Sequence, residues 1–271
     1  MINTGCCRVY LIVLLGLIVA PSARSAEPFP PRSLPGISLG DKLPAGYETS
    51  GILWHPRLKK FFLVSDSGIV SSMRPDGTGM IHLKVPGDLE GVTVANPKGN
   101  FVYLGIENPD SIRELNIVTG KVTRTFDLTP WMKGPDNSGL EALAFVPEAG
   151  HKEGGLFYSG LQADGSIFVF ELPIHSSKTS NTVKHVRTIP PLNGVADVAD
   201  MYYDANHSVL YALYGSGLLR SLKPDGTLIK EWKLPGKDQE GVTLKDGDLF
   251  IGEDYHNGGN VLKYPQFLDA P

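Results

Sequence analysis

The sequence predicts an all-β protein folded as a five-bladed β-propeller. Short apolar runs bounded by turn residues fill the chain, and no stretch of a dozen residues has convincing helical periodicity. One acidic motif recurs along the chain, and a similar series of strands and turns follows each copy. An all-β chain of this length forms a sandwich, a barrel or a propeller, and a repeat of about 40 residues favours the propeller.

The acidic motif sets the number of blades. Asp88-Leu-Glu90-Gly-Val-Thr recurs as Asp238-Gln-Glu240-Gly-Val-Thr and as Gly139-Leu-Glu141-Ala-Leu-Ala, with degenerate copies at Val198-Ala-Asp200 and Glu48-Thr-Ser50. The spacings are 40 (50 to 90), 51 (90 to 141), 59 (141 to 200) and 40 (200 to 240). The longest interval contains the polar stretch Ser176–Asn181, which we interpret as a loop insertion. Five copies predict five blades, and a six-bladed ring is the alternative.

Each motif strand precedes a second strand of similar composition. The expected second strands are Phe61–Ser65, Phe101–Gly105, Leu156–Gly160, Val209–Tyr214 and Leu249–Gly252. Third and fourth strands follow around Asp-Gly turns, which are strong hairpin signals, in Met73–Thr78 and Leu222–Thr227. The last motif is followed by 31 residues (240 to 271), enough for about three strands. We expect the segment around Ile37–Leu43 to supply the missing outer strand and close the ring, which leaves no open edge.

The N-terminal segment has the pattern of a secretory signal peptide. Arg8 precedes an apolar run, Val9–Ala20, and small residues follow in Pro21–Ala26. The run is shorter than the roughly 20 residues that span a bilayer. We predict a signal peptide over residues 1–26, cleaved near Ser25 or Ala26, and a single propeller domain over residues 27–271. The protein would then be periplasmic or extracellular; the alternative is an uncleaved anchor that attaches it to the cell membrane.

Composition excludes several classes of function. Both cysteines, Cys6 and Cys7, precede the predicted cleavage point, so the mature chain would have no disulfide and no thiolate site. The 25 basic and 29 acidic residues give a net charge of −4, and removal of Arg8 and Arg24 leaves 23 basic residues and −6. This balance argues against a nucleic-acid partner. No Gly-x-Ser-x-Gly, Walker or His-Glu-x-x-His motif is present. We expect a monomer.

The repeated acids should converge on one mouth of the central channel. Strand periodicity places Glu90, Glu141, Asp200 and Glu240 at the start of the innermost strands. Each second strand is antiparallel to the first, so its end lies beside that start. Acids at these ends are Asp66, Glu107, Glu253 and Asp254. The loop Tyr255–Gly259 hangs over the same mouth and adds His256 as a candidate proton-transfer group.

Like charges this close either take up protons or bind a cation. A hard cation with oxygen ligands, with Ca²⁺ as the first candidate, would neutralise the cluster. The predicted metal ligands are Glu90, Glu141, Glu240, Asp200, Asp66, Glu107 and Glu253. The other interpretation is that the acids hydrogen-bond backbone N–H groups of the next blade and only hold the ring together. If the protein is an enzyme, Glu107 or Glu253 is the candidate general base.

The chain resembles the SdiA-regulated family of bacterial exported or membrane-associated β-propellers. The resemblance rests on Ser50-Gly-Ile-Leu, Phe62-Leu-Val-Ser-Asp66, Leu89-Glu-Gly-Val-Thr93, Leu140-Glu-Ala-Leu-Ala-Phe145 and Gln239-Glu-Gly-Val-Thr243. Phytase-like and lactonase-type propellers use similar pieces. The resemblance implies a propeller, export and calcium binding, but no established reaction.

Together these observations favour a module that binds a small-molecule or envelope ligand. The module could also be associated with the membrane. The alternative function is a metal-dependent hydrolase of phosphate esters or lactones, in which the metal would polarise the substrate and activate a bound water.

Overall fold

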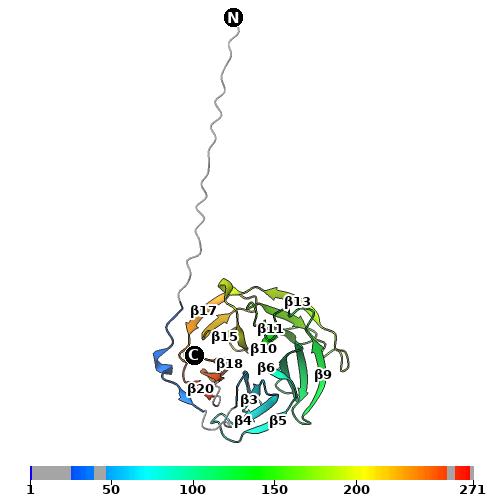
Figure 1. The fold of residues 1–271 in the computed structure, drawn as a ribbon, viewed down its shortest axis with the longest axis horizontal. Helices are drawn as coiled ribbons and strands as arrows, with labels where there is room; N and C mark the ends of the chain where they lie inside the picture. The colour runs from blue at the N-terminus through cyan, green and yellow to red at the C-terminus, as the bar shows by residue number, and fades with distance from the viewer. Residues whose placement is uncertain (2–25, 40–46, 255–259, 269–271) are drawn as a thin grey trace.

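The strands form five four-stranded antiparallel sheets arranged as a ring around a central axis (Figure 1). The computed structural model describes Met1 and residues 26–39, 47–254 and 260–268; residues 2–25 of the predicted signal peptide and His256 lie outside these ranges. Each sheet is one blade, so the five-bladed propeller is confirmed, and the described residues contain no sixth blade. No helix in this part of the chain is long and apolar enough to cross a membrane.

Four blades are built from consecutive strands that follow one another from the innermost position outward. Blade 1 is β2 (Gly51–His55), β3 (Lys60–Ser65), β4 (Ile69–Met73) and β5 (Ile81–Lys84). Blade 2 is β6 (Asp88–Thr93), β7 (Phe101–Glu107), β8 (Ser111–Asn116) and β9 (Lys121–Asp127). Blade 3 is β10 (Leu140–Pro147), β11 (Gly155–Leu161), β12 (Ile167–Glu171) and β13 (Lys184–Ile189). Blade 4 is β14 (Val198–Asp204), β15 (Val209–Tyr214), β16 (Leu218–Leu222) and β17 (Leu228–Lys233).

Blade 5 combines the two ends of the chain. Its inner strands are β18 (Gln239–Lys245), β19 (Asp248–Glu253) and β20 (Asn260–Tyr264), and β1 (Ile37–Ser38) pairs antiparallel with β20 as the outermost strand. The predicted closure by an N-terminal strand is therefore confirmed. The backbone N–H of Leu39 extends the pairing with a hydrogen bond of 2.8 Å to the carbonyl of Val261. Residues 40–43 of the expected strand lie outside the described ranges.

The N-terminal segment also contacts blade 4, which the sequence did not lead us to expect. The backbone N–H of Glu27 donates a 2.7 Å hydrogen bond to the carbonyl of Glu231, and Glu27 bridges in parallel to Trp232 on β17. Phe29, only 9% exposed, then packs beside Tyr264 and Phe267. A short 3₁₀ turn, η1 (Pro31–Ser33), leads on toward β1. One segment thus joins the last two blades (Figure 1).

The core lies between the blades. Five apolar clusters of buried residues are found among the described residues, one between each pair of neighbouring blades. The inner strands pass through these clusters, and burial of apolar surface on both faces of each sheet is the main force that holds such a ring together. A rigid ring is what fixes the side chains at its two channel mouths.

Repeated turns and the insertion behave as the sequence predicts. In the turns after β4 and β16, the carboxylates of Asp76 and Asp225 each accept a 2.9 Å hydrogen bond from the backbone N–H two residues on. The next residue in each turn is a glycine with positive φ, which a side chain would disfavour. The stretch Ser176–Asn181 is a loop between β12 and β13. Arg124 of β9 holds this loop by donating to the carbonyl of Ser177 at 3.0 Å.

Candidate metal centre

A β-bulge at the start of the inner strand positions the glutamate in three blades. Residue pairing between β6 and β7 shifts between Leu89 and Gly91, so Glu90 is the extra residue. The same shift surrounds Glu141 in β10 and Glu240 in β18. Bulges commonly re-aim a side chain at a functional position. Here the carboxyl groups of different blades come close enough to interact. As a result, the charge of Glu141 raises the pKa of Glu90, and the charge of Glu240 raises the pKa of Glu141.

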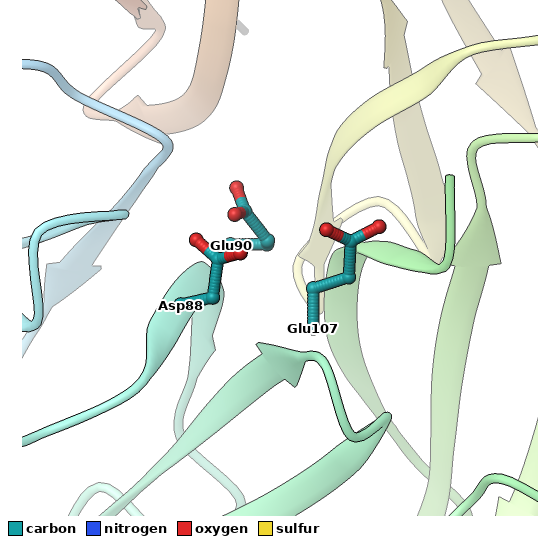
Figure 2. A group of neighbouring side chains, drawn as sticks. All are labelled: Asp88, Glu90 and Glu107. Atoms are coloured by element: carbon teal, nitrogen blue, oxygen red, sulfur yellow. The ribbon is translucent and has the colours of Figure 1, made fainter. Parts of the chain in front are cut away.

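The carboxyl groups of Asp88, Glu90 and Glu107 form the tightest acidic cluster. One oxygen from each lies within 4.8 Å of the others, and Figure 2 shows the three groups facing a common space. Asp88 and Glu107 are directly opposite each other in the pairing of β6 with β7. Like charges in this arrangement destabilise a sheet unless something neutralises them. No ion pair joins these three residues to a basic side chain in the part of the chain that the structure describes.

Burial makes the charged forms of these acids costly. Burial, together with the charges of Glu141, Asp88 and Glu107, raises the pKa of Glu90 to about 11. Burial, with the charges of Glu240, Glu107 and Asp197, raises the pKa of Glu141 to about 9. Glu107 has a raised pKa from burial too, although the backbone N–H of Gly139 donates a 2.5 Å hydrogen bond to its carboxylate. The mouth is thus a site where protons or a cation must compensate negative charge.

Blade 5 repeats the arrangement less tightly. Asp238, Glu240 and Asp254 occupy the positions of Asp88, Glu90 and Glu107, since the bulges of β6 and β18 align. Burial, with the charges of Asp197, Asp254 and Asp238, raises the pKa of Glu240 to about 8. Among the described residues, however, only the cluster in blade 2 brings three carboxylates within 4.8 Å.

Glu253 comes one residue before Asp254 and is not part of the acidic group of blade 5. It pairs with Gln239 and is 2% exposed, and burial raises its pKa to about 7. The side chain of Asn260 donates a 3.4 Å hydrogen bond to its carboxylate. Asp254, not Glu253, is therefore the counterpart of Glu107. Glu253 has a pKa suited to proton transfer, but it belongs to blade 5 and is not part of the cluster in blade 2.

Asp200 holds blades together instead of joining the acidic cluster. In β14 the pairing shift leaves Ala199 as the extra residue, so Asp200 takes the position of Gly91 and Gly241. Its carboxyl group is buried and accepts hydrogen bonds from the backbone N–H groups of Val242 at 2.8 Å and Met201 at 2.8 Å. A longer contact of 3.4 Å reaches the N–H of Ile52 in blade 1. This is the stapling role that was one of the two interpretations of the motif acids.

Replacement of Asp200 by alanine should destabilise the ring. It would leave buried N–H groups of β18 and β2 without an acceptor, at a cost of about 1–3 kcal/mol for each unsatisfied group. We expect a loss of about 3 kcal/mol in the free energy of unfolding, measured by urea denaturation. Asp200→Asn retains an acceptor oxygen and should lose clearly less. Equal losses for the two variants would show that the hydrogen bonds contribute little.

The other predicted ligands are more dispersed. Asp66 is exposed at the end of β3, where its N–H donates a 3.2 Å hydrogen bond to Ser50 Oγ. Asp88 was not among the predicted ligands, although Asp-x-Glu recurs at 88–90 and 238–240 and would have indicated it. Asp197 was also missed; it lies before β14 and contributes charge at Glu141 and Glu240.

Comparisons with known proteins bear on the fold only. No family model matches the chain, and no curated protein does. The chain is similar to the β-propeller domain of Myceliophteria thermophila Cps50 (Swd1), with 11% identity and a TM-score of 0.48 over 76% of this chain and 62% of that one. It is also similar to Myxococcus xanthus glutaminyl cyclase, with 13% identity and a TM-score of 0.42 over 61% of each chain. The matches therefore span less than two thirds of these proteins.

Proposed function

We propose that this protein is an exported propeller that binds a divalent cation, with Ca²⁺ as the first candidate, at its acidic mouth and uses it to bind a ligand. The observation that carries the proposal is the cluster of Asp88, Glu90 and Glu107, whose oxygens lie within 4.8 Å of one another. A donor set made only of carboxylates suits a hard cation such as Ca²⁺. A bound cation would offset the like-charge repulsion that raises the pKa of Glu90.

The proposed ligand site uses the open side of the cation. Ca²⁺ takes six to eight oxygen ligands, and three carboxylates supply only part of that number. The remaining positions would be filled by water or by an oxygen of the ligand. Oxygen-rich envelope or small-molecule ligands therefore fit this mouth better than apolar ones. The resemblance to the SdiA-regulated family supports the same proposal.

Export is part of the proposal and agrees with the position of the first ring contacts. The signal-peptide pattern ends near Ser25 or Ala26, and Glu27 makes the first described hydrogen bond to blade 4. Cleavage at that point would leave this contact and every later one in place. N-terminal sequencing of protein from the periplasmic fraction should find Ala26 or Glu27; Met1 in the membrane fraction would indicate an anchor.

The geometry favours binding over phosphate-ester hydrolysis. Arg113, a basic residue near the mouth, donates to the carbonyl of Pro86, and burial lowers its pKa. Both oxygens of Glu107 accept hydrogen bonds, from the Gly139 N–H and from the Asn108 side chain at 2.9 Å. A general base needs a free oxygen, which leaves Glu253, 2% exposed and with a pKa of about 7, as the remaining candidate if the protein hydrolyses lactones or esters.

Thermal unfolding with and without Ca²⁺ tests the cation site. A ligand that binds only the folded protein at a hundredfold excess over Kd adds about 2.7 kcal/mol to its stability. For a domain of this size, that corresponds to a rise in Tm of about 5–10 °C. EDTA should reverse the rise.

Paired variants decide which acids are responsible. Asp88→Asn removes one charge from the cluster and should abolish most of the Ca²⁺ response, while Asp66→Asn, at the same mouth but outside the cluster, should retain it. If Ca²⁺, Mg²⁺ and EDTA all leave the melting curve unchanged at about millimolar concentrations, and metal analysis finds no bound ion, the cation site does not exist.

A further inference from the structure

A pocket of about 430 Å³ lies at the channel mouth opposite the acids. The ends of the inner strands of all five blades, β2, β6, β10, β14 and β18, surround it. Thr93 of β6 lines this pocket and lies three residues beyond Glu90, so the two sites are about 10 Å apart along the strand. The side chain of Asp200, which reaches two neighbouring inner strands, lies between them.

Unequal side chains at the strand ends create the pocket. Near the end of the inner strand, blade 4 has Tyr202 and Tyr203, whereas blade 2 has Thr93 and Val94 at the corresponding positions. The small residues of blade 2 leave space that the tyrosines of blade 4 border. A pocket of this volume, formed by a rigid scaffold at the mouth of a β-structure, has the size and position of a small-molecule site.

The buried part of the pocket lining is mainly apolar. Leu53, Phe145 and Leu244 line the pocket and are 4%, 6% and 4% exposed. Their burial keeps water away from the base of the pocket, while Trp54 and Tyr202 are partly exposed on its wall. A ligand must therefore present an apolar face or edge to the protein.

The rim carries hydrogen-bonding groups of both kinds. The ammonium of Lys245 lies 5.2 Å from the centroid of the Trp54 ring and pairs with Asp246. Asp204 is only 6% exposed, and its carboxylate already contacts the backbone N–H of Asn206 at 2.9 Å and His207 Nδ1 at 2.6 Å, whereas the side chain of Asn206 is exposed. Amide, ammonium and carboxylate groups thus lie together around an aromatic and apolar base, with both charges represented.

We propose that this pocket binds a neutral saccharide. A sugar ring has an apolar face that packs on aromatic side chains, and its hydroxyls both donate and accept hydrogen bonds as the rim requires. An organic cation would be repelled by the ammonium of Lys245, 5.2 Å from the centroid of the Trp54 ring, whereas a neutral ring would not. An organic anion would meet the exposed carboxylate of Asp246. The site is separate from the acidic mouth and does not depend on the cation proposed there.

Binding can be measured on the full chain with five probes. Maltose, cellobiose and N,N′-diacetylchitobiose represent neutral saccharides, and choline and glucuronate represent the cation and the anion. Saturation-transfer NMR and tryptophan fluorescence should detect at least one disaccharide with a Kd of about 1 mM, unchanged by EDTA. Choline and glucuronate should bind at least about tenfold more weakly.

Matched variants locate the binding. Trp54→Phe retains an aromatic core contact but removes the indole from the wall, and it should weaken binding about tenfold. Asn206→Ala, an exposed change on the rim, should weaken it severalfold without affecting Tm. Trp131→Phe makes the same chemical change in the link between β9 and β10 and should have no effect. The proposal is wrong if none of the three disaccharides binds at about 10 mM, if choline or glucuronate binds best, or if Trp54→Phe and Asn206→Ala both bind normally.

Discussion

Replacing Phe29 with alanine should destabilise the protein by about 3 kcal/mol or more, the usual cost of removing a buried phenyl ring. Phe29 lies in the apolar cluster between blades 4 and 5, 5.0 Å from the ring of Tyr264 and 5.5 Å from that of Phe267. The variant would leave a cavity where the N-terminal segment joins the last two blades. For a domain of this size the loss corresponds to a fall in Tm of about 6–12 °C.

The control for this prediction lies five residues further along the same segment. Leu34 is 44% exposed, and Leu34→Ala should change the stability by no more than about 0.5 kcal/mol. Calorimetry or urea denaturation of both variants gives the comparison. If Phe29→Ala unfolds at the same temperature as Leu34→Ala, the packing of the Phe29 ring between blades 4 and 5 contributes nothing to ring closure.

The blade architecture could be predicted because it depends on repetition. Five copies of a motif at similar spacings, each followed by a strand and often by an Asp-Gly turn, leave few alternatives to a propeller. The final blade was also predictable by counting, since too few residues follow Glu240 for four strands. The bridge from Glu27 to β17 was not predictable. It involves a few residues without periodicity, and tertiary contacts alone fix their position.

The acidic mouth could be predicted only to the level of the strand end. Periodicity placed Glu90, Glu141 and Glu240 correctly, but it contains no information about β-bulges. A bulge shifts the pairing of a strand with its neighbour by one residue. A side chain that periodicity assigns to the channel can then face the next blade, or the reverse. This is why Asp200 aligned with the glutamates in the sequence but lies at the glycine position in the structure. It is also why Glu253 was predicted as a ligand although Asp254, its neighbour at the same strand end, is the counterpart of Glu107.

Without a bound cation, the stability of the protein should fall as the pH rises from about 5 to about 9. Burial and neighbouring carboxylates raise the pKa of Glu253 to about 7, of Glu240 to about 8 and of Glu141 to about 9. In this pH range these glutamates keep their protons in the folded protein. In the unfolded chain they have already lost them, because their pKa there is that of an ordinary carboxyl group. Stability that these groups contribute is therefore present at low pH and lost as the pH approaches the folded-state values, by about 1.4 kcal/mol per pH unit for each retained proton.

Urea denaturation in EDTA at several pH values measures this slope directly. Glu240→Gln removes one retained proton and should reduce the slope between pH 5 and about 8 by up to about 1.4 kcal/mol per unit. Glu171→Gln is the matched control, because hydrogen bonding to Lys152 lowers the pKa of Glu171 and moves its titration below this range. A stability that is flat or rises over the same interval would show that the mouth acids are already ionised in the folded protein.

Ca²⁺ should oppose this loss, because it binds the deprotonated carboxylates and so competes with protons. The gain in stability on adding Ca²⁺ is therefore expected to be larger at pH 8.5 than at pH 6, and proton release on binding should be measurable by calorimetry in two buffers. Asp88→Asn should remove this pH-dependent gain while leaving the slope contributed by Glu240 in EDTA largely intact, since Asp88 and Glu240 lie in different blades. A Ca²⁺ effect equal at both pH values would mean that the ion binds outside the acidic mouth.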